Sequence, residues 1–94
     1  MPNIEIYGQP DDHARSKMYV KVTDAMRNLT FQDDIVITDL SSVYCYDLRG
    51  CLQPFIRVYD TDKKEIDMVV EALQPLGYDI ETLLLTGFYP GKKK

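Results

Sequence analysis

The chain has 94 residues, of which 45% are hydrophobic and 28% charged, and eleven basic against fifteen acidic residues give a formal net charge of −4. This length fits one domain, and the composition excludes a disordered chain, a collagen-like chain and a disulfide scaffold. Because no basic excess attracts phosphates and no apolar run approaches the ~18 residues that span a bilayer, we expect neither a nucleic-acid nor a membrane partner. The N-terminus lacks a signal-peptide pattern, which favours a cytoplasmic protein.

The first half of the chain predicts a strand, a helix and a second strand. Residues 3–7 alternate in polarity as a strand does, and Pro10-Asp11-Asp12 supplies the turn and cap for a helix. Residues 34–40 are short, apolar and rich in β-branched side chains, which is typical of a buried strand. Between these two predicted strands, apolar residues recur at steps of three and four, as on the buried face of a helix. They are Ala14, Met18, Val22, Ala25 and Leu29.

A connector follows, in which Val43-Tyr44-Cys45-Tyr46 predicts a β-rich segment before the turn at residues 47–50. Five residues separate Cys45 from Cys51, a spacing that matches no zinc or redox motif, and His13 is the only histidine. We therefore expect reduced thiols, with Cys45 buried and inert, and neither a metal nor a cofactor.

The second half repeats the first. Residues 2–8 and 54–60 align with proline, isoleucine, a β-branched apolar residue and tyrosine at identical spacing. Thr61 or Asp62 is suited to cap a second helix, which the sequence Gln74-Pro75-Leu76-Gly77 ends, and residues 79–85 predict a last strand. The apolar face of that helix comprises Ile66, Val69, Val70 and Leu73.

Two strand–helix–strand units predict a single α+β domain, with a mixed four-stranded sheet and two helices on one face. Its parallel pairs are residues 3–7 with 34–40 and 54–60 with 79–86, and the two strands that follow the prolines lie antiparallel at the centre. Repeat one spans about 2–40, the connector 41–53, repeat two about 54–88 and a solvated tail 89–94. A ferredoxin-like fold has the same element order, but a third strand would separate its parallel strands.

The second face of the sheet is expected to be aromatic, with Tyr7, Phe55 and Tyr59 from the strands and Tyr44 and Tyr46 from the connector. A partner subunit explains such a face better than water does, which predicts a homo-oligomer. The alternative is a half-exposed aromatic face in a monomer.

The chain resembles the tautomerase superfamily, which includes 4-oxalocrotonate tautomerase and macrophage migration inhibitory factor. The resemblance rests on Pro2 after the initiator methionine, the strand Asn3-Ile4-Glu5-Ile6-Tyr7 and the amphipathic helix after it. It continues with Ile35-Val36-Ile37-Thr38 and with the second unit opening at Pro54-Phe55-Ile56-Arg57-Val58. It implies a duplicated βαβ fold, a homotrimer and keto–enol isomerisation of a small 2-oxo or enol acid, with Pro2 as general base.

Pro2 has chemistry suited to that role. Once Met1 is removed, Pro2 presents a secondary amine, and an apolar pocket would lower the pKa of an amino group from its ordinary ~7.7–8.0. A neutral amine can take a proton from the carbon beside a carbonyl and return it elsewhere. The alternative is that Pro2 merely starts a strand, where a missing N–H is tolerated.

The carboxylate-binding arginines of the family have no counterparts here, because Gln9-Pro10 and Asp33-Asp34-Ile35 stand near their places. The remaining candidates for a substrate-binding cation are Arg15, Lys17, Arg49 and Arg57. We rank Arg57 and then Arg49 as binders of a substrate carboxylate or carbonyl, with Tyr44 and Tyr46 as pocket walls or proton donors. Arg57 could instead pair with Glu5.

The missing arginines leave three functions open. The first is a tautomerase-like enzyme acting on a small carboxylate or carbonyl substrate. The second is a non-catalytic oligomeric relative, which the missing arginines favour. The third is a ferredoxin-like binding or regulatory module, which would need no free Pro2.

Overall fold

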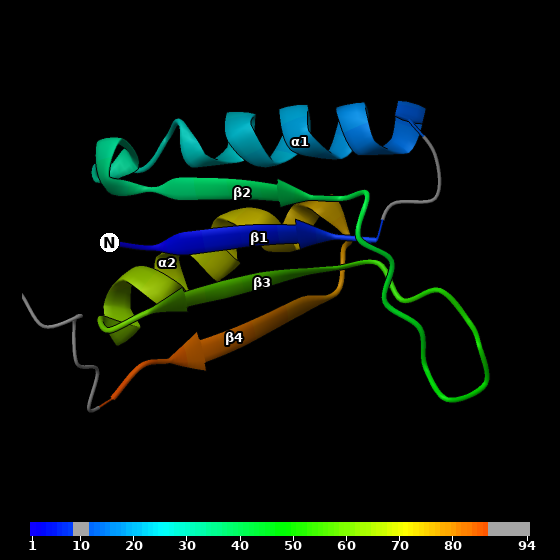
Figure 1. The fold of residues 1–94 in the computed structure, drawn as a ribbon. Coiled ribbons are helices and arrows are strands. Elements are labelled where there is room, and N and C mark those ends of the chain that lie inside the picture. Colours follow the sequence, from blue (N-terminus) through cyan, green and yellow to red (C-terminus); the bar gives the residue numbers. More distant parts are fainter. Residues whose placement is uncertain (9–11, 87–94) are drawn as a thin grey trace, which may run out of the picture.

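The computed structural model describes residues 1–8 and 12–86 (Figure 1), so Pro10-Asp11 of the predicted helix cap and the predicted tail at 89–94 lie outside the described residues. The element order agrees with the prediction from the sequence. In chain order the elements are β1 (Asn3–Tyr7), α1 (Asp12–Met26), a 3₁₀ turn (Gln32–Asp34), β2 (Val36–Leu40), β3 (Phe55–Asp60), α2 (Lys63–Leu73), a second 3₁₀ turn (Gln74–Leu76) and β4 (Ile80–Leu84).

The four strands form one mixed sheet in the order β2-β1-β3-β4. β1 pairs with β2 and β3 pairs with β4, both in parallel, while β1 and β3 run antiparallel at the centre with Glu5 opposite Arg57. The predicted α+β fold of two βαβ units is therefore confirmed. The ferredoxin-like alternative is wrong, because no strand separates the members of either parallel pair.

Both helices contribute to the core on one face of the sheet. Figure 1 shows α2 behind the central strands and α1 along the β2 side. The fully buried strand residues are Ile4, Ile6, Ile56 and Val58, and the buried helix residues are Met18, Val22, Met26, Ile66, Val69 and Leu73. Alternation along β1 and β3 therefore leaves Glu5, Tyr7, Arg57 and Tyr59 on the opposite, open face.

The predicted ends of α2 are confirmed. The Asp62 side chain accepts hydrogen bonds from the backbone N–H groups of Lys64 and Glu65, which selects Asp62 over Thr61 as the cap. Gly77 ends the following turn at a φ of 80°, a left-handed conformation that glycine adopts without steric cost.

The connector differs from the prediction, because no strand forms at residues 43–46. It forms a hairpin-like loop at residues 45–53, the connector hairpin, in which Tyr46 and Leu52 make an isolated bridge. The Gln53 N–H donates to the Cys45 carbonyl, and Cys45 is half-buried rather than buried. Residues 43–46 thus pair with no strand of the described sheet, and the bridge that they make is local to the connector.

The outer strands also differ from the prediction of buried strands. Val36 on β2 and both Leu83 and Leu84 on β4 are exposed. Each outer strand has a partner on one side only in the described sheet, so a composition suited to a strand does not by itself secure burial. No described helix is long and apolar enough to cross a membrane.

Candidate functional site

Pro2 lies at the start of the central strand β1, next to the end of β3. Its side chain is fully buried, and its carbonyl accepts a hydrogen bond of 3.0 Å from the Val36 N–H. Asn3 pairs with Tyr59 across the two antiparallel strands, so the next register position places Pro2 opposite Asp60. The nitrogen of Pro2 is thus held at the boundary between the core and the end of the sheet.

Asp60 is a carboxylate on the core face of the sheet, with a side chain only 2% exposed. Its Oδ1 lies 3.2 Å from the amino group of Met1 and accepts a 2.6 Å hydrogen bond from the Thr61 N–H. The same amino group lies 3.8 Å from Oε1 of Glu65. While Glu65 is ionised, Oδ2 of Asp60 is buried without a hydrogen-bond partner. Two carboxyl groups therefore hold the amino terminus at this end of the sheet.

The two carboxyl groups titrate differently. Burial raises the pKa of Asp60, but hydrogen bonds with Glu65, the Thr61 N–H and the amino terminus outweigh burial and leave this pKa below its ordinary value. The hydrogen bond to Asp60, followed by burial, raises the pKa of Glu65. The coupling therefore favours the negative charge on Asp60 over a negative charge on Glu65.

A hollow of about 230 Å³ opens beside this pair. Its described lining comprises Met1, Asn3, Asp60, Thr61 and Leu85. No arginine or lysine is among these lining residues, so the described wall is acidic and apolar. Pro2 itself is not among the described lining residues of this hollow, because its side chain is fully buried, so the expected apolar pocket around Pro2 stays a prediction.

Arg57 lies in the middle of β3 on the open face, where two carboxylates bind it. Its Nε donates to Oε1 of Glu81 at 2.8 Å, and its Nη1 lies 3.6 Å from Oε1 of Glu5. The hydrogen bond to Glu81 raises the pKa of Arg57. The predicted pairing of Arg57 with Glu5 is confirmed, and its role as a binder of a substrate carboxylate stays a prediction.

Aromatic side chains surround this ion pair. The rings of Tyr7 and Phe55 stack with centroids 4.7 Å apart, and the Arg57 guanidinium lies 5.3 Å and 5.4 Å from their centroids. Tyr7 donates a 2.7 Å hydrogen bond to Glu5, and burial together with this bond raises its pKa. Burial and the charge of Glu5 likewise raise the pKa of Tyr59. The face is aromatic as predicted, but its rings belong to a polar network.

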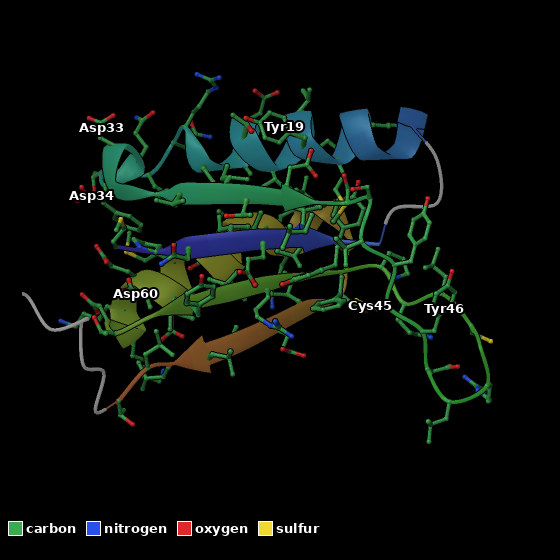
Figure 2. The ribbon with its side chains drawn as sticks, viewed as in Figure 1. Tyr19, Asp33, Asp34, Cys45, Tyr46 and Asp60 are labelled. Atoms are coloured by element: carbon green, nitrogen blue, oxygen red, sulfur yellow. The ribbon has the colours of Figure 1, made fainter. Side chains whose placement is uncertain are left out.

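The connector residues Tyr44, Tyr46 and Arg49 are not near Pro2 in the same chain. Figure 2 shows Tyr46 at the end of the sheet opposite Asp60. The Arg49 guanidinium is 3.0 Å from Oδ2 of Asp47, and its side chain is 81% exposed. Within one protomer the five predicted site residues thus occupy three places: one end of the sheet, its open face, and the connector at the other end.

The sequence analysis did not identify Asp60 and Glu65 as a pair that binds the amino terminus. The repeat contains a signal that could have found Asp60. Ile56, Val58 and Asp60 alternate onto one face, so a carboxylate follows two core residues, and a carboxylate there needs a partner. Over the described part of the chain, no three His, Cys, Asp or Glu side chains gather closely enough to hold a metal ion.

No family model and no curated protein matches the chain. Among solved structures, the chain is similar to FG41 malonate semialdehyde decarboxylase inhibited by 3-bromopropiolate, with a TM-score of 0.38 and 12% identity, over 97% of this chain and 91% of that chain. That protein belongs to the tautomerase superfamily. A similarity of this size supports no conclusion about activity.

Proposed function

We propose that the chain is a tautomerase-like protein that interconverts the keto and enol forms of a small carbonyl compound through the amine of Pro2. The position of Pro2 supports this proposal. It lies at the start of a central strand, opposite the buried Asp60 and beside a hollow of about 230 Å³.

The reaction requires that Met1 be removed. While Met1 is attached, the Pro2 nitrogen is an amide and has no basic lone pair; after removal it is a secondary amine. The neutral amine takes a proton from the carbon beside the carbonyl, the C–H electron pair forms the C=C bond of the enolate, and the resulting ammonium protonates the oxygen. Asp60 stabilises the ammonium that forms in the first step.

The same carboxylate also favours the protonated form of the resting amine, which reduces the fraction available as a base at neutral pH. We therefore expect the isomerisation rate to rise with pH through the titration of the Pro2 amine. An Asp60→Asn variant should reach its full rate at lower pH, because an amide does not stabilise the ammonium as a carboxylate does.

The described wall of the hollow offers no cation to a substrate carboxylate. A carboxylate substrate such as the enol of phenylpyruvate therefore requires a cation from a second copy, whereas an uncharged carbonyl compound does not. We propose a homo-oligomer, for which the exposed edge strands and connector residues give the physical motive and the resemblance indicates a trimer. A soluble, cytoplasmic protein fits this proposal.

A second candidate is a non-catalytic oligomeric relative with the same fold. It is favoured by one observation, the absence of arginine and lysine from the described lining of the hollow. In that case the Asp60–Glu65 pair would only anchor the amino terminus.

The test uses the enol of phenylpyruvate as substrate and intact mass to confirm that Met1 is absent. Pro2→Ala should lower the rate by about 100-fold or more, the range expected for loss of a positioned base. Pro54→Ala is the matched control, since Pro54 occupies the same place in the second repeat, is exposed and lies within the chain. Equal rates for Pro2→Ala and the unmodified chain, or full activity in a sample that retains Met1, would contradict the proposal.

A further inference from the structure

Met1 is bound by side chains at the end of the sheet where β3 and β4 end, much as a small ligand would be (Figure 1). Its amino group lies 3.2 Å from Oδ1 of Asp60 and 3.8 Å from Oε1 of Glu65. Its carbonyl oxygen accepts a hydrogen bond of 3.1 Å from Nδ2 of Asn3. Its side chain lines the hollow of about 230 Å³, as does Leu85. The ammonium, the carbonyl and the apolar side chain of one amino-acid residue are thus each matched by a group at this site.

The two carboxyl groups at this site require a cation. The side chain of Asp60 is only 2% exposed, and its Oδ2 is buried without a hydrogen-bond partner while Glu65 is ionised. A buried carboxylate is costly unless a cation or hydrogen-bond donors compensate its charge. The ammonium of Met1 contributes to that compensation, and no arginine or lysine is among the described residues that line the hollow. When Met1 is removed, the pair loses this ammonium and can bind another.

The place of Met1 also determines where the carbonyl group of such a ligand would lie. The carbonyl carbon of Met1 is bonded to the nitrogen of Pro2, so a ligand in the same place has its carbonyl group and its α-carbon next to that nitrogen. The side-chain amide of Asn3, which donates to the Met1 carbonyl, would donate to the carbonyl oxygen of the ligand. Such a donor stabilises the negative charge that develops on the oxygen when the α-carbon loses a proton.

We propose that the processed chain, which begins at Pro2, binds a small α-amino carbonyl compound in the place of Met1. The ammonium of this ligand lies between Asp60 and Glu65, its carbonyl oxygen at Asn3, and its apolar side chain in the hollow. An ammonium is the charge that complements the described wall, whereas the family that the chain resembles binds a carboxylate through arginines.

The ligand class also fits the chemistry proposed for Pro2. The positive charge of a bound ligand disfavours the protonated form of the amine beside it, so ligand binding and the basic form of Pro2 favour each other. The statement that this ligand is a substrate rests on the proposed function. Its binding requires only that Met1 be removed and is tested without an activity assay.

The first test is a titration of the processed chain with methioninamide, followed by NMR of its backbone amides, with intact mass to confirm that Met1 is absent. The signals of Asn3, Thr61 and Leu85 around the hollow should shift, and that of Gly50 in the connector hairpin should not. N-acetylmethioninamide lacks the charge and should bind about 10-fold more weakly or worse, the range expected for loss of a hydrogen bond to a charged group. Equal binding of the two compounds, or no shift at these three residues, overturns the proposal.

A second test uses variants of the chain. Glu65→Gln should weaken the binding of methioninamide by about 10-fold and leave that of the acetylated compound unchanged, because only the first carries the ammonium. Glu71→Gln, which removes an exposed carboxylate from the same helix, is the matched control and should bind as the unmodified chain does. A chain that retains Met1 should also bind about 10-fold more weakly or worse, because its own residue occupies the site. Equal effects of the two variants, or full binding by the chain that retains Met1, overturns the proposal.

A third test separates a small compound from the amino terminus of a peptide. Methionylglycinamide continues beyond the carbonyl group, where the fully buried Pro2 leaves no room, and should bind more weakly than methioninamide. Equal binding would identify a peptide terminus as the ligand and overturn the assignment to a small compound.

This proposal and the proposed function fail in different ways. A processed chain that isomerises the enol of phenylpyruvate but does not bind methioninamide overturns the ligand class and leaves the isomerisation through Pro2 standing. A processed chain that binds methioninamide at the hollow but isomerises no carbonyl compound supports the ligand class and contradicts the proposed function.

Discussion

Replacing Asp60 by Asn tests the buried carboxylate at the Pro2 end of the sheet. Asn keeps the shape and retains an oxygen that can accept from the Thr61 N–H, but it removes the charge that faces the amino terminus. Met1, whose amino group pairs with Asp60, has a side chain that is 64% exposed. The ion pair itself therefore contributes at most about 1 kcal/mol. Weakening the hydrogen bond from Thr61 adds about 0.5–1 kcal/mol, because bonds to charged acceptors are stronger. We expect a loss of about 1–2 kcal/mol near pH 7.

The loss should depend on pH. The pKa of Asp60 is lower in the folded chain than in the unfolded chain, so its stabilisation is present above the ordinary carboxyl pKa of about 4 and disappears as pH falls through the folded value. The pKa of Glu65 is raised, so its stabilisation is present below the ordinary pKa and disappears as pH rises through the folded value. The difference between the unmodified chain and Asp60→Asn should therefore be largest near neutral pH and shrink in acid.

Urea unfolding followed by circular dichroism between pH 3 and pH 7 measures this difference directly. In a separate thermal unfolding experiment at pH 7, the melting temperature should fall by roughly 5–10 °C, given a domain of this size. Asp67→Asn, which removes an exposed carboxylate paired with Lys63, is the control and should change stability by less than about 0.5 kcal/mol. A difference for Asp60→Asn that is zero at pH 7, or that persists unchanged at pH 3, would refute this account of the pair.

Three further predictions concern the fold and the open face. Gly8→Ala should cost about 2 kcal/mol in urea unfolding, because Gly8 has a φ of 75° and an added Cβ would lie 3.3 Å from the Cα of Pro54. Gly50→Ala, with a similar φ and free space, should cost only about 1 kcal/mol. Leu73→Ala should lower the free energy of unfolding by about 2–5 kcal/mol, because the side chain is fully buried, and a loss below 1 kcal/mol would contradict its place in the core. Tyr7 should ionise above its ordinary pKa in an ultraviolet titration, and Glu5→Gln should lower that pKa; no change on substitution would contradict the hydrogen bond as a cause.

The fold could be predicted because two independent patterns in the sequence agree. The repeated prolyl strand and the helical spacing after each copy predict two βαβ units, and alternation places Ile4, Ile6, Ile56 and Val58 on the helix side, as observed. Strand pairing then follows from right-handed crossovers between parallel neighbours. The burial of β2 and β4 could not be predicted in the same way, since it depends on what lies beyond the edges of the sheet.

The candidate site was predicted less completely, because it depends on contacts between distant residues. The pairing of Arg57 with Glu5 could be predicted because both side chains lie on the same face of the sheet. The closer partner of Arg57 is Glu81, and that contact depends on the register of β4 against β3. The connector does not pair as a strand, so the positions of Tyr44 and Tyr46 could not be obtained from alternation. Asp60 could be recognised as a site residue only once the register of β1 and β3 placed it opposite Pro2.

The state of the Pro2 nitrogen is the central claim, and one comparison tests it most directly. The processed chain, which begins at Pro2, and a chain with an uncleaved N-terminal extension are assayed with the enol of phenylpyruvate at equal concentration and equal oligomeric mass. The account predicts that only the processed chain catalyses ketonisation, because the extension keeps the nitrogen as an amide. Equal rates for the two chains would contradict it.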